Sequence, residues 1–149
     1  MNLRGNQTIS HIMKYLLLLS LILLIIITGC VNTQPKKETL VQEELDKVGI
    51  RTSGFNKQLS LNLPETLLDA NWGLKKIVCE EGGYDLAKYA NQAVNIYSYR
   101  SNRYYENEQL NVWVITNENE VICVYLTVSE SSGLVPGVFS VNDPNVKVK

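Results

Sequence analysis

Three acidic side chains that lie close together in the sequence are the first candidates for chemistry. Glu80 and Glu81 precede a pair of glycines, and Asp85 follows it. Such carboxylates could bind calcium, and two that face each other could hydrolyse a glycosidic bond. Calcium loops alternate acidic residues with others, and this stretch has no such alternation. We therefore interpret the three acids as the solvated end of a helix and expect no metal site.

The position of the only histidine limits the remaining chemistry. His11 lies ahead of a long apolar segment, and no histidine follows it. The rest of the chain therefore lacks the histidine base of serine and cysteine hydrolases and the usual ligands of zinc. From this we expect a protein that is not an enzyme and that uses no cofactor.

Aromatic and cationic side chains gather in one expected hairpin. Tyr104, Tyr105 and Trp113 lie there, with Arg103 beside them. Aromatic rings stack on sugars or anchor protein interfaces, and arginine pairs with carboxylates. These four residues are therefore the candidate partner surface. The alternative, which the general behaviour of sheets favours, is cross-strand packing, and Tyr104 and Tyr105 at the hairpin tip are its best exceptions.

Two cysteines leave two alternatives open. Outside the cytoplasm Cys79 and Cys123 could form a disulfide. They could also be separate buried thiols, each acting as a small apolar side chain. Cys79 falls in an expected helix and Cys123 in the middle of an expected strand, and no pattern brings them together. The sequence therefore favours separate thiols.

The amino-terminal segment has the layout of a secretory signal, with basic residues ahead of an apolar run. The run, residues 15–28, is shorter than the roughly 20 residues that a membrane-spanning helix needs. Its ending, Ile27-Thr28-Gly29-Cys30, resembles the lipobox of bacterial lipoproteins. The resemblance implies a diacylglyceryl group on the Cys30 thiol and cleavage between Gly29 and Cys30. It also implies acylation of the new amino terminus, as by palmitate.

The expected domains follow from this signal. They are a signal peptide over residues 1–29, a lipid-anchored tether over residues 30–37 and one α+β domain over residues 38–149. Translation could start at Met1 or at Met13, where a compact signal begins. Stable anchoring takes more than one acyl chain, which a diacylglyceryl group supplies without a spanning helix.

The expected mature chain is mildly acidic. The whole chain has 14 basic and 15 acidic residues and a net charge of −1. The signal holds two basic residues, Arg4 and Lys14, and no acidic one, so the mature part is more acidic still. An acidic domain without a basic run is a poor match for nucleic acid, and we expect no such partner.

Two helices are expected early in the domain. Apolar residues with helical spacing predict one helix over residues 38–48 and a second from Pro64 to the Gly82-Gly83 pair. An alternating segment between them, residues 58–63, predicts a strand. The second helix is expected to bury an apolar stripe made of Leu67, Leu68, Trp72, Ile77 and Val78.

A strand meander is expected to follow. Strands are predicted over residues 93–100, 110–116, 121–128 and 138–141. The short turns between the first three are typical of antiparallel pairs. We therefore expect an α+β fold in which two helices pack on one face of a mostly antiparallel sheet of about four to five strands.

One stretch resembles a known bacterial family. It comprises Gly83-Tyr84-Asp85-Leu86, Lys88-Tyr89 and the strand Ile96-Tyr97-Ser98-Tyr99, and it follows a Leu63-Pro64-Glu65 strand end. These residues resemble the family known as domain of unknown function 4830. Its members are small secreted or lipid-anchored proteins, largely of low-GC Gram-positive bacteria. The resemblance covers about residues 40–141. It implies an extracytoplasmic location and supplies no activity and no catalytic residues.

The expected function is a non-catalytic binding or accessory module on the extracytoplasmic face of the cell membrane. The lipid on Cys30 would hold it to the membrane, and its partner would be an envelope protein or a cell-wall component. Two alternatives stay open. One is a small carboxylate-based hydrolase of cell-wall glycans, and the other is an envelope sensor or inhibitor domain.

Overall fold

The computed structural model describes residues 34–128 and 137–149. The expected signal peptide, the cleavage positions Gly29 and Cys30 and the lipid site therefore lie outside the described residues. The chain divides into two units, Met1–Pro35 and Lys36–Lys149, and the second holds the sheet. No helix in the described ranges is long and apolar enough to cross a membrane.

The first described helix, α2 (Gln34–Lys47), begins earlier than the predicted residue 38 and ends close to the predicted position. Its apolar side chains Val41 and Leu45 are buried, as the periodicity indicates. Gly49 follows the helix with a φ of 65°, a left-handed conformation that glycine adopts without steric cost. The Gly49 N–H donates to the carbonyl of Asp46 and closes the helix end.

The second helix, α3 (Ala70–Glu81), is shorter than predicted. Its N-cap is Asp69, whose carboxylate accepts the backbone N–H groups of Asn71 and Trp72 at 2.9 and 2.8 Å. This cap fixes the helix start at Ala70, so the predicted start at Pro64 is wrong. The chain turns between β1 and Asp69, and a short 3₁₀ helix, η1 (Leu86–Tyr89), follows α3.

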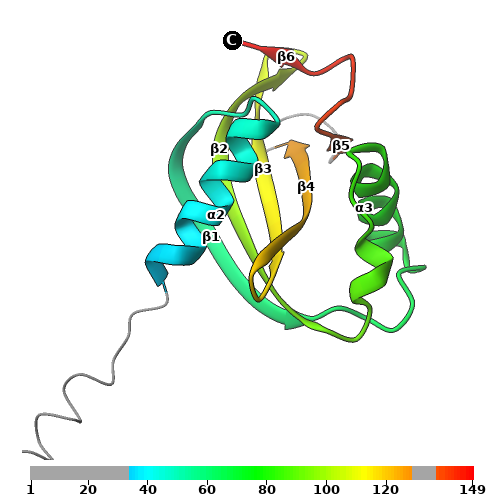
Figure 1. Cartoon of the computed structure of the whole chain (residues 1–149). Coiled ribbons are helices and arrows are strands. Elements are labelled where there is room, and N and C mark those ends of the chain that lie inside the picture. Colours follow the sequence, from blue (N-terminus) through cyan, green and yellow to red (C-terminus); the bar gives the residue numbers. More distant parts are fainter. Residues whose placement is uncertain (1–33, 129–136) are drawn as a thin grey trace, which may run out of the picture. The chain divides into compact units, whose positions relative to one another are not determined.

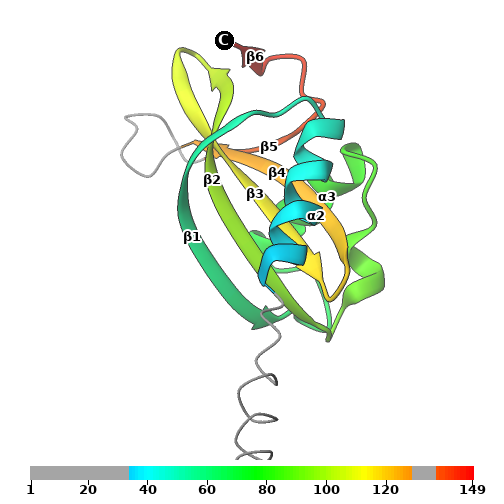
Figure 2. The same ribbon diagram turned by 60° about the vertical axis from the view of Figure 1, so that its left-hand side comes forward.

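The strands form one 6-stranded sheet in the order β1-β2-β3-β4-β5, with β6 paired to β2. Every pair is antiparallel, which confirms the expected meander and the broad α+β class (Figures 1 and 2). The edge strand β1 is longer than predicted, and β6 was not predicted. The strands are β1 (Thr52–Asn62), β2 (Ala93–Tyr105), β3 (Glu108–Asn117), β4 (Glu120–Val128), β5 (Val138–Ser140) and β6 (Lys147–Val148).

Buried side chains form two clusters. One contains Val41 of α2 together with Val114 of β3, and the other contains Cys79 of α3 together with Ile115 of β3. Successive residues of a strand point to opposite faces of a sheet, so the two helices contribute to clusters on opposite faces. This differs from the expected single face. Periodicity identifies the apolar side of a helix but not the face of the sheet that it meets.

A disulfide joins Cys79 of α3 to Cys123 of β4. The sequence favours separate thiols, and the structure corrects that prediction. Both cysteines lie in the predicted types of element and are fully buried. The sequence indicates the two elements but not that their cysteines meet, because that meeting depends on the packing of α3 beside β4.

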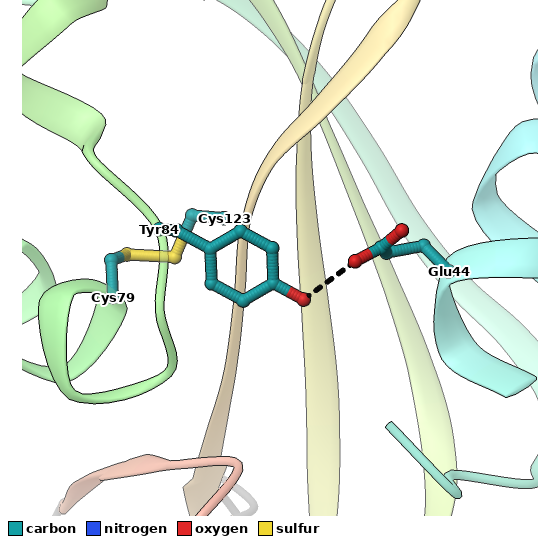
Figure 3. The surroundings of a disulfide bond; sticks show 4 residues. All are labelled: Glu44, Cys79, Tyr84 and Cys123. Carbon is teal, nitrogen blue, oxygen red and sulfur yellow. Dashed lines mark hydrogen bonds between the residues drawn. A yellow bond between two sulfur atoms is a disulfide. The ribbon is translucent and has the colours of Figure 1, made fainter. Parts of the chain in front are cut away.

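Tyr84 continues the connection from α3 toward α2. Its backbone N–H donates to the carbonyl of Cys79 at 2.9 Å, and its ring packs against both buried clusters. Its hydroxyl donates to Oε1 of Glu44 in α2 at 2.9 Å (Figure 3). Burial, followed by the Glu44 carboxylate, raises the pKa of Tyr84 above its ordinary value. One side chain therefore links both clusters.

Replacing both cysteines, Cys79→Ala together with Cys123→Ala, is expected to lower the free energy of unfolding by about 2 to 4 kcal/mol. The physical reason is that the bond closes a loop between residues 44 apart and so restricts the unfolded chain. Urea unfolding of the oxidised proteins measures the difference. A reductant should destabilise the native chain and leave the double variant unchanged. Equal stability of the two oxidised proteins would contradict the assigned role of the bond.

Tyr84→Phe is expected to change the dependence of stability on alkaline pH. A tyrosine with a raised folded-state pKa stabilises the fold fully below its unfolded pKa of 10.0, and the contribution is lost as the pH rises above that value. The variant should be about 1 kcal/mol less stable below pH 10.0 and should lose less stability above it.

Thermal unfolding over a series of pH values tests this expectation. Burial also raises the pKa of Tyr125, so part of the alkaline loss should persist in Tyr84→Phe. Gln42→Ala, an exposed substitution on α2 that removes no titrating group, is the control and should follow the native profile. An alkaline slope that is the same in Tyr84→Phe and in the native chain would rule out the contribution of this hydroxyl.

Candidate functional site

Two of the three acidic residues around Gly82 and Gly83 form surface ion pairs, and the third, Glu81, accepts a hydrogen bond from the Asn142 amide through its backbone carbonyl. Glu80 pairs with Lys76 at 2.9 Å and Asp85 pairs with Lys88 at 3.2 Å, and all four side chains are substantially exposed to solvent. Across residues 34–128 and 137–149, no group of three or more His, Cys, Asp or Glu residues is placed to hold a metal ion. Glu80 and Asp85 therefore form two separate ion pairs and do not face each other across a common site.

Arg103, one of the predicted partner-surface residues, caps α2 instead of facing outward. Its Nη2 donates to the carbonyl of Val48 at 2.9 Å and to that of Gly49 at 3.2 Å. Carbonyl groups at a helix end lack partners within the helix, and a cation there also interacts favourably with the helix dipole. The guanidinium therefore fastens the end of α2 to strand β2.

Trp113 lies apart from the hairpin tip. It stands opposite Ser98 in the sheet, and its ring stacks on Tyr125 with centroids 6.2 Å apart. Its Nε1 donates to Oγ1 of Thr127 at 2.9 Å. These contacts are the cross-strand packing that the sequence analysis gives as the alternative. The structure does not bring Trp113 together with the two tip tyrosines.

Tyr104 and Tyr105 contact other parts of the chain. The Tyr105 ring packs on Phe139 with centroids 4.7 Å apart, and Lys149 Nζ lies 4.7 Å from the centroid of the Tyr104 ring. Both tyrosines line a hollow beside the carboxyl-terminal strand, together with Lys147. The four predicted residues therefore have intramolecular contacts and do not form one exposed patch.

A different apolar surface is exposed on and beside α3. Leu68 is 82% exposed, Leu74 is 56% exposed and Ile77 is 51% exposed. We call these three side chains the α3 face. Leu68 and Ile77 are predicted to lie in the buried stripe of a longer helix, and that prediction is wrong because both are exposed. The true helix start, at Ala70, was the missing information.

Local geometry explains the exposure of the α3 face. Val78 and Cys79 point inward. Ile77 lies on the side of the helix away from Cys79, and Leu74, one turn before it, lies at the border of the buried side near Val78. Leu68 precedes the N-cap, where an apolar residue often packs against the fourth helical residue. That fourth residue is Gly73, which has no side chain to offer.

Lysines lie at the edge of the α3 face. Lys75 Nζ lies 4.6 Å from the centroid of the Trp72 ring, and Lys76 forms the ion pair with Glu80. Burial lowers the pKa of Lys75, and Asp69 acts in the opposite direction. The arrangement is therefore an apolar centre with charged side chains at its rim, as in protein–protein interfaces.

Comparison with known proteins supplies no relative. No family model matches the chain, and no curated protein and no solved structure matches it either. The resemblance of residues 40–141 to a family of unknown function therefore stays a prediction.

Arg103→Ala is expected to lower the free energy of unfolding by about 1.5 to 3 kcal/mol, because two helix-end carbonyls lose a charged donor. Arg100→Ala, on the exposed side of the same strand, is the matched control and should change stability by less than about 0.5 kcal/mol. Chemical denaturation of both variants measures the difference. Two variants of equal stability would show that Arg103 does not anchor α2.

Proposed function

We propose that this chain is a lipid-anchored, non-catalytic binding or accessory module on the extracytoplasmic face of a bacterial cell membrane. The observation that carries the proposal is the α3 face, with Leu68 82% exposed and Leu74 and Ile77 more than half exposed. Single exposed leucines are common, but several on one turn and helix mark a surface that a partner covers.

The chemistry of this face favours a protein partner with an apolar groove. A helix presenting apolar side chains one turn apart is a recurrent way of binding such a groove. Ala70 on the same side of α3 is exposed and small, which allows a partner backbone to come close. The Lys76–Glu80 ion pair at the rim would stay in water when the centre is covered.

Two features support the location. A buried disulfide is typical of proteins that fold outside the reducing cytoplasm. The lipobox-like ending at Cys30 supports attachment to the membrane through lipid. In this proposal both helices pack on the sheet, and the buried side chains that they share with β3 support that arrangement.

The test captures the partner from the native membrane. The tagged full chain is crosslinked in its own cells, purified in detergent and analysed by mass spectrometry. Leu74→Glu should reduce recovery of a specific envelope protein at least tenfold, or about 1.4 kcal/mol, because it places a charge in the apolar centre. Its stability should change by less than about 0.5 kcal/mol, because the side chain is exposed.

Phe55→Glu is the matched control, since Phe55 on β1 is 57% exposed and belongs to another surface. It should recover the same protein as the native chain. Cys30→Ala should release the chain from lipid attachment and leave residues 1–29 in place. Full recovery of the partner by Leu74→Glu would exclude the α3 face as the binding surface.

A further inference from the structure

A second surface of different chemistry lies where β1 ends and β2 begins. Two hollows adjoin there and share Glu118 of the β3–β4 turn. One lies between the end of β1 and the start of β2, and the other lies between η1 and the β3–β4 turn. Both are shallow and open to solvent, with volumes of about 410 and 540 Å³. We call the pair the amide hollow.

Amides and carboxylates dominate its lining. Each amide offers two N–H donors and one carbonyl acceptor, and each carboxylate offers acceptors alone. The polar side chains of the lining include Asn62, Gln92, Asn95, Asn117, Glu118 and Glu120.

Hydrogen bonds already hold several of these side chains in place. Ser60 Oγ donates to Oδ1 of Asn95 at 2.7 Å, and Tyr89 donates to Oε1 of Glu120 at 2.9 Å. The Asn117 amide donates to the Gln92 side-chain carbonyl. The bond to Asn95 uses its carbonyl only, so its two N–H donors are available to a ligand. Groups that are held before binding lose less conformational entropy when a ligand arrives.

Charge restricts the class of ligand. The lining includes two carboxylates, Glu118 and Glu120, and no lysine or arginine among the described residues. An anionic ligand such as a phosphate would therefore be repelled. A neutral polyhydroxylated ligand fits, because its hydroxyls can donate to carboxylates and accept from amides. Ala93, which is exposed in the same lining, adds a small apolar surface on which the C–H face of a sugar ring can rest.

We infer that the amide hollow binds a neutral oligosaccharide. This site lies apart from the α3 face and uses different contacts, so it adds a ligand to the proposed module. Cell-wall glycan is the source of such chains at the proposed location, and this choice of source rests on the proposed function. The prediction that the hollow binds a neutral oligosaccharide does not depend on the proposed function.

The experiment uses the full chain, labelled with nitrogen-15, in micelles of a sugar-free zwitterionic detergent. Soluble chitotetraose, cellotetraose and maltotetraose are added in separate titrations and followed by two-dimensional NMR. At least one should shift the side-chain amide resonances of Gln92, Asn95 and Asn117 in a saturable way. Gln92→Ala should weaken that binding about fivefold, the effect of losing one hydrogen bond.

Gln42→Ala is the matched control, because Gln42 is an exposed glutamine on α2 whose side chain bonds Asp46 alone. It should bind the saccharide as the native chain does. Leu74→Glu should also bind it normally, and Gln92→Ala should still capture the protein partner, so the two sites can fail separately. No saturable shift with any of the saccharides would overturn the inference. Shifts produced by calcium chloride or inorganic phosphate in place of the saccharides would overturn it as well.

Discussion

The covalent bond between Cys79 and Cys123 is the constraint on which the arrangement around α3 depends. The helix has just two buried residues, Val78 and Cys79, so burial alone contributes only a few kcal/mol to its attachment. An isolated helix of 12 residues is marginal in water. The neighbouring strand β5 is short and pairs only with residues 125–127, so it does not extend alongside Cys123. The disulfide therefore fixes α3, which packing alone would hold only weakly against β4.

Because the bond fixes α3, the helix can carry apolar side chains on its outer side. In an ordinary amphipathic helix these side chains would compete for the core. Here the side that carries Cys79 must face β4, and Leu74 and Ile77 are left in water. The same bond places Tyr84, which follows the helix and bonds Glu44 of α2. Arg103 fastens the other end of α2, so two polar contacts position that helix.

The sequence predicts the sheet better than it predicts the candidate sites. Strands β2 and β3 largely alternate apolar and polar residues, and β4 is a short apolar run rich in valine; clear turns bound all three, so local pattern is enough to find them. The edge strand β1 is exposed along most of its length, so its first half lacks alternation and was missed. The start of α3 was misplaced because Pro64 and Asp69 are both suitable helix-start signals, and only the observed cap distinguishes them.

The candidate sites depend on contacts between distant residues, which local patterns do not reveal. Arg103 bonds the carbonyls of Val48 and Gly49, which lie 55 and 54 residues before it in the sequence. The two cysteines are 44 residues apart. The amide hollow had a detectable signal, since asparagine and glutamate crowd the turn at residues 117–120. By itself that signal indicates only a turn, because the partners Asn62 and Gln92 lie elsewhere in the sequence.

Hydrogen exchange on the full chain, with and without a reductant, tests most directly whether the disulfide holds α3 in place. The account predicts that reduction removes the protection of backbone amides in α3 and leaves those of β2, β3 and β4 protected. Exchange in α3 that stays as slow after reduction as before it would contradict the account. It would show that packing, and not the bond between Cys79 and Cys123, fixes the helix and its outward apolar face.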